Sequence, residues 1–196
     1  SNIKGIEFEF KSEIKFISDL VNSFNLNFNT SFISSRTYIF GDELSSKLDN
    51  LRDGESLNDN NDFQERFFNL LGIQDNSEYY RVMQGQAPYL VNVGLSYTNN
   101  ENYLQCGIYY NVQGKTLSVV SVNREPDIYS SPFHSLNLNL SKKFGNKNQI
   151  KVNLGAKNIL NSKKEMLTDS FEAIDEIYSS YDPAREFFIK LSYNLK

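Results

Sequence analysis

Hydrophobic and polar residues alternate strictly along residues 135–160, which read SLNLNLSKKFGNKNQIKVNLGAKNIL. Before a polar turn, Leu136, Leu138 and Leu140 alternate with serine and asparagine, and the same period of two resumes from Ile150. Successive side chains of a β-strand point to opposite sides of a sheet, so this period indicates strands with one apolar face. The segment therefore predicts a two-faced β-hairpin.

The same alternation recurs along most of the chain and predicts an all-β protein. Near the start, Ile6, Phe8 and Phe10 alternate with charged residues, and near the end Ile189 and Leu191 alternate with lysine and serine. The predicted strands cover residues 3–12, 22–34, 87–98, 103–113, 133–145, 149–160 and 185–195. Most are longer than the 5–6 residues typical of soluble sheets, and they match the 9–11 residues of a strand that crosses a bilayer.

The links between these strands are alternately short and long. The short links are 13–21, 99–102 and 145–148, and the long ones are about 35–86, 114–132 and 161–184. Consecutive links of an up-and-down sheet lie at opposite ends, so all long links fall on one rim, as in outer-membrane barrels. Aromatic residues near strand ends, such as Tyr89, Tyr97 and Phe187, fit the aromatic girdles of such barrels. We therefore expect a transmembrane antiparallel up-and-down β-barrel with its apolar face toward lipid.

Seven strands are too few for such a barrel, because bacterial barrels have even strand numbers from eight upward. An open sheet would also leave backbone groups unpaired in the lipid. We therefore expect residues 1–196 to be the C-terminal portion of a larger barrel, either as a processed product or as a piece of a longer chain. Residues 115–122 are a missed strand or an extension of the sheet beyond the membrane, and the extension is favoured.

Composition argues against several classes of function. With 20 basic and 24 acidic residues and a net charge of -4, the chain lacks the excess of basic residues that is typical of nucleic-acid-binding proteins. Its single cysteine, Cys106, excludes an internal disulfide, and its single histidine, His134, has no neighbours at metal-ligand spacing. We find no nucleophile–base pair and no phosphate-binding glycine loop, so we expect no enzyme, no metal and no cofactor. Acidic clusters within 53–62 and 169–176 indicate solvated loops, with calcium or cationic-substrate contact as the alternative.

The longest link contains two kinds of sequence. Residues 42–62 are polar and acidic, which is typical of an exposed loop. Residues 62–72 have apolar positions at helical spacing, with Asp62 and Glu65 as a capping box and Gly72 as a stop signal. They predict a short helix over the outer rim.

Several motifs together resemble the TonB-dependent receptors of Bacteroidota. They are QGQAPYLVNVGLSY at 84–97, PDIY at 126–129, LNLSKKFG at 138–145, GAKNILN at 155–161 and AREFFIKLSY at 184–193. The resemblance implies a 22-stranded barrel in the bacterial outer membrane, with an N-terminal plug and a TonB box that lie outside these residues. It implies as partners the outer-membrane lipid and lipopolysaccharide, the N-terminal barrel and plug portion of the same receptor, TonB, and possible surface lipoproteins or larger outer-membrane complexes.

The function expected from this resemblance is part of the energised uptake of a nutrient. Two alternatives stay open: a receptor homologue that serves as a structural subunit of an outer-membrane complex, and a soluble β-sandwich or lipocalin-like binding protein. The ligand is not determined by the sequence, and siderophores, glycans, peptides and vitamins all fit. The residues expected to contact a ligand or partner from the outer loops are Tyr79, Tyr80, Arg81, Arg124, Tyr129, Tyr178 and Tyr181.

Overall fold

All regular structure in the described part of the chain is β-strand. The computed structural model describes residues 1–15, 22–39, 80–121, 125–145, 148–168 and 174–194. The predicted helix at 62–72 and the acidic segment 42–62 lie outside the described residues. The all-β, antiparallel fold class is therefore confirmed for the described ranges.

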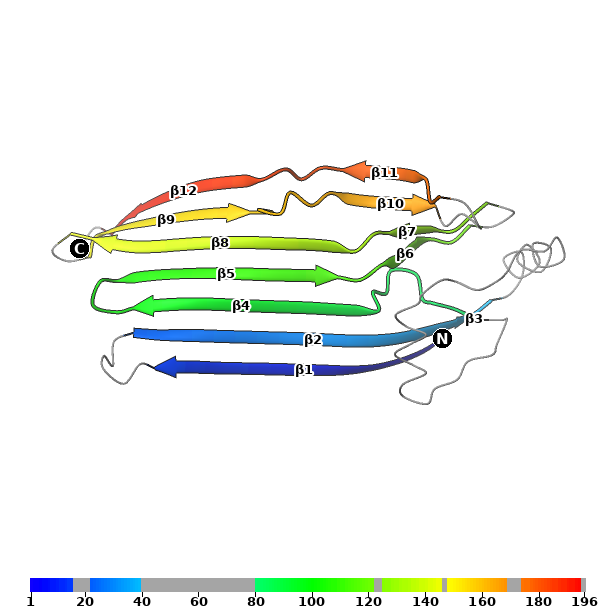
Figure 1. The fold of residues 1–196 in the computed structure, drawn as a ribbon, viewed down its shortest axis with the longest axis horizontal. Coiled ribbons are helices and arrows are strands. Elements are labelled where there is room, and N and C mark those ends of the chain that lie inside the picture. The colour runs from blue at the N-terminus through cyan, green and yellow to red at the C-terminus, as the bar shows by residue number, and fades with distance from the viewer. Residues whose placement is uncertain (16–21, 40–79, 122–124, 146–147, 169–173, 195–196) are drawn as a thin grey trace.

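Seven long strands form one antiparallel sheet, the main sheet, in which every strand neighbours the next in the order β1-β2-β4-β5-β8-β9-β12 (Figure 1). They are β1 (Asn2–Lys15), β2 (Asn22–Tyr38), β4 (Tyr89–Asn99), β5 (Leu104–Gln113), β8 (Phe133–Phe144), β9 (Ile150–Lys157) and β12 (Glu186–Tyr193). Each corresponds to one strand predicted from the alternation. The sheet is open, since β1 and β12 do not pair with each other. Membership of a closed barrel stays a prediction.

A second, four-stranded sheet, the extension sheet, continues from one end of the main sheet (Figure 1). It has the order β11-β10-β7-β6 and consists of β6 (Thr116–Val119), β7 (Ile128–Ser130), β10 (Lys164–Thr168) and β11 (Ile177–Tyr181). β6 lies inside the predicted extension at 115–122. The other three strands fall in links predicted as loops, because strands of three to five residues show too little alternation to stand out. The short β3 (Tyr80–Arg81) pairs with the end of β2.

The deeply buried apolar side chains of the described residues lie where the two sheets meet. They are Ile39, Ala87, Val112, Leu117, Ile128 and Tyr129. The segment between β3 and β4 joins the sheets, because the Ile33 amide donates to the Pro88 carbonyl and the Gly85 amide to the Leu117 carbonyl, both at 2.8 Å. Away from this junction, the described residues of the main sheet form no such core. Its side chains are therefore presented on two open faces.

Candidate functional site

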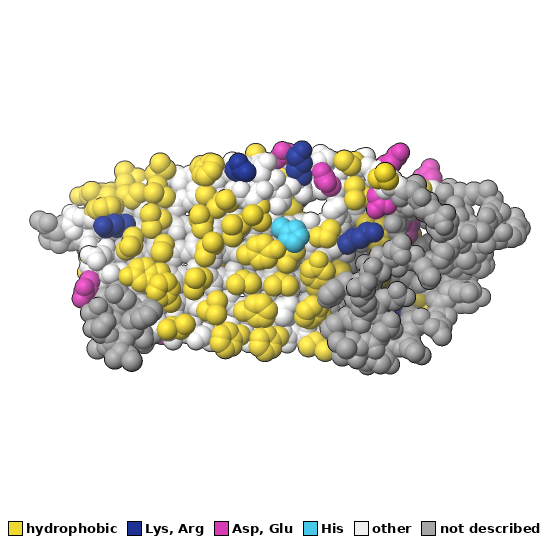
Figure 2. Space-filling model, viewed as in Figure 1, with side chains coloured by type: hydrophobic (Ala, Val, Ile, Leu, Met, Phe, Trp, Pro, Cys, Tyr) yellow, Lys and Arg dark blue, Asp and Glu magenta, His cyan; other side chains and the backbone are white. Residues whose placement is uncertain are grey.

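One face of the main sheet is a continuous apolar surface, which we call the apolar face. The strand registers align its side chains in rows that cross all seven strands. One complete row consists of Ile14, Phe24, Tyr97, Cys106, Leu140, Leu154 and Ile189. Figure 2 shows these yellow side chains covering the face from the β1 edge to the β12 edge. Paired residues of neighbouring strands lie on the same face of a sheet, so the apolar positions of the seven strands combine into one apolar surface.

The apolar face is exposed, and no second layer of the described residues packs on it. Leu138, Ile189 and Leu191 are 43%, 78% and 70% exposed. A shallow groove of about 470 Å³ crosses the central rows, where the small Cys106 and Ala156 lie among larger apolar side chains. Exposed apolar surface of this extent marks a site of contact with another apolar body.

The opposite face of the main sheet, the polar face, carries a hydrogen-bonded ladder of asparagines. The Asn111 Nδ2 donates to Asn92 Oδ1 at 2.7 Å, Asn92 Nδ2 donates to Asn29 Oδ1 at 3.5 Å, and Asn29 Nδ2 donates to Glu7 Oε1 at 3.0 Å. The ladder runs from β5 to β1 and satisfies neighbouring amides across the strands. Such a face suits water or a polar partner.

Two aromatic rings of the polar face lie against glycines, Tyr109 against Gly107 of its own strand β5 and Gly94 of β4, and Phe188 against Gly155 of the neighbouring strand. A Cβ atom at Gly107 would lie 2.7 Å from the Tyr109 hydroxyl oxygen, and one at Gly94 would lie 3.0 Å from the same ring. The Phe188 ring of β12 covers Gly155 of β9 in the same way, with no room for a Cβ atom. Glycine at these positions therefore lets an aromatic ring lie flat on the sheet.

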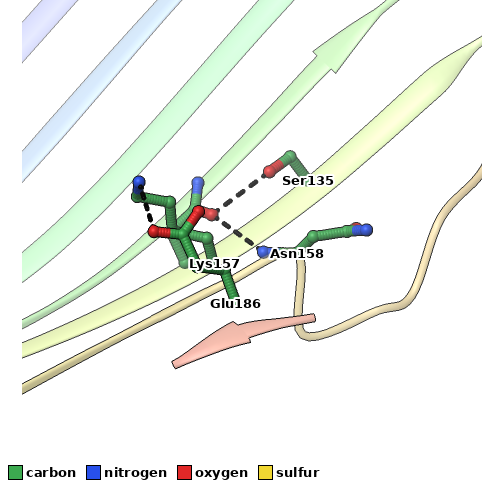
Figure 3. Close-up of polar contacts among 5 residues, drawn as sticks. Ser135, Lys157, Asn158 and Glu186 are labelled. Atoms are coloured by element: carbon green, nitrogen blue, oxygen red, sulfur yellow. Dashed lines mark hydrogen bonds and ion pairs between the residues drawn. The ribbon is translucent and has the colours of Figure 1, made fainter. Parts of the chain in front are cut away.

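Asn158 ends β9 and fixes the link from β9 to β10. Its side chain is buried, its φ is 50°, and its Nδ2 donates to the Ser162 and Ala184 carbonyls at 3.1 and 2.9 Å. Its Oδ1 accepts from the Ser162 amide at 3.0 Å, and its own amide donates to Asn137 Oδ1 at 3.1 Å. Figure 3 shows it beside Ser135 and the Lys157–Glu186 ion pair. This is a structural site, because its polar groups are satisfied within the chain.

The predicted contact residues do not form one cluster. Tyr79 and Arg124 lie outside the described residues. Tyr178 and Tyr181 are each 62% exposed on β11, at the open edge of the extension sheet. Tyr129, in contrast, is only 2% exposed, and the Lys115 Nζ lies 4.4 Å from the centre of its ring.

Tyr80 and Arg81 form the separate strand β3. The Tyr80 ring contacts the Tyr38 ring edge-on at 5.5 Å, and the Arg81 Nη1 donates to the Val82 carbonyl at 3.0 Å. Of the described candidates, Tyr178 and Tyr181 are therefore the ones best placed to contact a partner, while burial gives Tyr129 a packing role.

His134 lies at the start of β8 on the apolar face, paired with Val112 of β5. Its Nδ1 lies 2.6 Å from the Tyr110 hydroxyl oxygen, so the two polar groups satisfy each other in apolar surroundings. Within the described ranges, no group of three or more His, Cys, Asp or Glu side chains is arranged to hold a metal ion.

No family model matches the chain, and neither curated proteins nor solved structures give a match. The described residues contain no α-helix with the length and hydrophobicity needed to span a bilayer. The candidate site is thus defined by the geometry of the chain itself: a wide apolar face backed by a polar one.

Sequence reasoning missed the asparagine ladder, the ring–glycine contacts and the role of Asn158. The alternating asparagines of 25–29 indicate a polar face, but only the strand register brings Asn29 opposite Asn92 and Asn111. A usable signal existed at Asn158, because asparagine after an alternating run tolerates the left-handed conformation that ends a strand.

Proposed function

We propose that this chain forms the C-terminal part of the barrel wall of a TonB-dependent outer-membrane receptor, which imports a nutrient ligand. The motifs that resemble these receptors of Bacteroidota support the family. The all-β meander with long links at one end supports the architecture. In this proposal the apolar face contacts lipid, and the polar face borders the aqueous interior and the plug.

The observation that carries the proposal is the exposed apolar face of the main sheet. Burying one large apolar side chain is worth about 1.5–3 kcal/mol, so a face with rows of such residues is strongly unfavourable in water. Lipid removes this cost along the whole face. The asparagine ladder on the other face supports a hydrated interior, because moving side-chain amides from water into an apolar environment costs free energy.

The two open edges support a wall with more strands than these seven. The outer sides of β1 and β12 have no partner strand among the described residues. Unpaired backbone amides and carbonyls each cost several kcal/mol inside a bilayer, so further strands must pair with both edges. In the proposal, the N-terminal barrel portion of the same receptor supplies them.

Transport in this proposal is non-covalent. The outer loops and the plug bind the ligand, and TonB supplies energy from the inner-membrane motor through the N-terminal part of the receptor. The contribution of this chain to ligand or partner contact comes from the extension sheet, where Tyr178 and Tyr181 are exposed.

Thiol labelling in intact cells tests the membrane placement, because Cys106 is the only cysteine of residues 1–196 and lies on the apolar face; any cysteine elsewhere in the full-length protein is first replaced by serine. The full-length protein should fractionate with the outer membrane. A charged, membrane-impermeant maleimide should label Tyr178→Cys in a Cys106→Ser background, whereas native Cys106 should react only after unfolding. A soluble protein whose native Cys106 reacts as fast as Tyr178→Cys would refute the proposal.

Growth of a deletion strain tests the transport role. Loss of the gene should impair growth on one limiting nutrient from a panel of siderophores, glycans, peptides and vitamins, and disruption of TonB should impair growth on the same nutrient. Normal growth across the panel, with the protein still in the outer membrane, would refute import and favour a structural subunit.

A further inference from the structure

A small hollow lies in the polar face of the main sheet, within the strands β1, β2, β4 and β5, which are neighbours in Figure 1. Its volume is about 150 Å³. Two adjacent rows of paired residues line it: Glu9, Asn29, Asn92 and Asn111 in one, and Lys11, Asn27, Gly94 and Tyr109 in the other. Gly94 has no side chain, so its position leaves space between the side chains of its neighbours. We call this hollow the amide pocket.

The asparagine ladder fixes the orientation of the amide groups in the amide pocket. The ladder ends on the Glu7 carboxylate, which accepts from the Asn29 Nδ2 at 3.0 Å and, when ionised, can only accept hydrogen bonds. Asn29 therefore turns its Oδ1 toward Asn92, and Asn92 turns its Oδ1 toward Asn111. A side-chain amide has two N–H donors and two acceptor positions, and the ladder uses one of each on Asn92. Among the described residues, no other side chain or backbone group uses the remaining donor and acceptor, which leaves them to a ligand.

Tyr109 supplies an aromatic surface on the other side of the amide pocket. A Cβ atom at Gly94 would lie 3.0 Å from the Tyr109 Cδ1, so the ring lies flat on the sheet. One side of the ring covers glycine, and the ring also lines the pocket. The face of an aromatic ring is electron-rich and attracts the weakly positive C–H groups of another ring. The pocket therefore offers a stacking surface next to a row of oriented amides.

The two rows that line the amide pocket carry no net charge. Glu9 and Lys11 line it from β1 and form an ion pair with each other. The other side chains of the two rows are amides and a phenol. A charged ligand gains little from such a surface, because it meets no uncompensated opposite charge. Hydroxyl groups donate and accept at the same time, so they match the paired N–H groups and oxygens of the amides.

The size of the amide pocket restricts what it can take. Pockets that enclose drug-sized ligands measure about 300–1,000 Å³, which is at least about twice the volume here. The pocket therefore accommodates one ring of a larger molecule, whose remainder extends over the polar face. A sugar ring fits these groups, because its hydroxyls can bond to the amides while its C–H side stacks on the aromatic ring.

We infer that the amide pocket binds one sugar unit of an uncharged oligosaccharide. The inference rests on the proposed function: it narrows the nutrient ligand to saccharides and adds a contact inside the lumen to the contact at the extension sheet. In the proposed arrangement the polar face is turned away from the lipid, so the saccharide comes from the medium and not from lipopolysaccharide. A polar segment of the plug is the competing occupant, and the experiments below distinguish it.

Binding to the purified full-length receptor in detergent tests the amide pocket. The probes are neutral oligosaccharides of glucose, mannose, galactose, xylose and N-acetylglucosamine, with ferrichrome, cobalamin and a tetrapeptide as ligands of other classes. Isothermal titration calorimetry compares the variants. Asn27→Ala removes a pocket amide whose side chain makes no hydrogen bond to other described residues, and Asn25→Ala is the matched control on the same strand and face, outside the pocket. Tyr109→Ala removes the aromatic surface, whereas Tyr109→Phe keeps it.

We expect one neutral oligosaccharide to bind and Asn27→Ala to weaken its binding roughly 2- to 10-fold. Tyr109→Ala should weaken binding roughly tenfold or more, while Asn25→Ala should leave it unchanged and Tyr109→Phe should retain most of it. Unchanged affinity in Asn27→Ala would overturn the site, and this variant decides the question if Tyr109→Ala fails to assemble. Binding of no probe, or only of ferrichrome, cobalamin or the peptide, would overturn the saccharide class and leave the membrane placement intact.

Thiol labelling of Asn27→Cys, in a receptor whose other cysteines are replaced by serine, distinguishes a saccharide from the plug as the occupant. The bound oligosaccharide should slow the reaction of this cysteine with a small methanethiosulfonate reagent. Absence of reaction in the folded receptor, with and without the saccharide, would show that polypeptide covers the pocket and would overturn the inference. A receptor that does not fractionate with the outer membrane would instead overturn the proposed function.

Discussion

A charge placed at the centre of the apolar face gives the most direct energetic test of lipid contact. Leu138 lies in the row that contains Leu95, Ile108 and Ala156, and all these neighbours are apolar. Lys142 is four residues away on the same strand, about 13 Å, and adds positive charge rather than a counter-ion. We therefore choose Leu138→Arg as the perturbation.

The expected destabilisation follows from depth. Leu138 lies in the middle rows of the apolar face, which the proposed function places near the bilayer centre. An arginine there costs about 2–4 kcal/mol, falling to about 0–1 kcal/mol at the interfaces. Leu138→Arg should therefore lower the ratio of folded to unfolded protein by roughly 30-fold to several hundred-fold. The neighbouring Asn139→Arg is the matched control, because residue 139 lies on the polar face, and its effect should stay within about 0.5 kcal/mol.

Urea unfolding of the full-length receptor in phospholipid vesicles measures these values, with folded and unfolded forms separated by electrophoresis without heating. Tyr193→Arg, at the end of the apolar face next to the turn between β8 and β9, serves as the depth control and should cost less than Leu138→Arg. Equal destabilisation by Leu138→Arg and Asn139→Arg would refute the assignment of the two faces.

Two further predictions concern the internal geometry of the sheet and use the same unfolding assay. Asn158→Ala should lower the free energy of unfolding by about 2–3 kcal/mol, because it removes three side-chain hydrogen bonds to the Ser162 and Ala184 backbone. The control Ser162→Ala keeps those backbone groups and should have little effect. An equal loss of stability in the two variants would contradict the role of Asn158. Gly155→Ala should cost about 1–3 kcal/mol because its methyl group displaces the Phe188 ring. Adding Phe188→Ala should make Gly155→Ala nearly neutral, and a cost of Gly155→Ala that stays the same in both backgrounds would show that the ring contact is not its cause.

The sequence determined the seven long strands and their two faces, because alternation is a local property of each strand. Each predicted strand of the main sheet, for example 103–113 against β5, appears within a few residues of its predicted limits. Strong alternation also made the apolar face predictable, since Leu138 and Leu140 share it in any pairing that keeps one face apolar.

The short strands of the extension sheet were not predictable in this way. β7 and β10 depend on pairing with each other across the two long links, and three to five residues carry too little local pattern. This is why Tyr129 was expected on an exposed loop, whereas pairing between β6, β7 and β10 buries it. Tyr178 and Tyr181 are exposed on the edge strand β11, and their contact with a ligand or partner stays a prediction.

The tertiary structure alone decided how the strands line up. Register is set by backbone hydrogen bonds between segments far apart in the chain, and no single strand contains that information. The register brings Asn29, Asn92 and Asn111 together on the polar face, and it joins the apolar sides of seven separate strands into one continuous apolar face. A strand by itself shows which of its sides is apolar, and only its paired neighbours show which residues lie beside one another on that side.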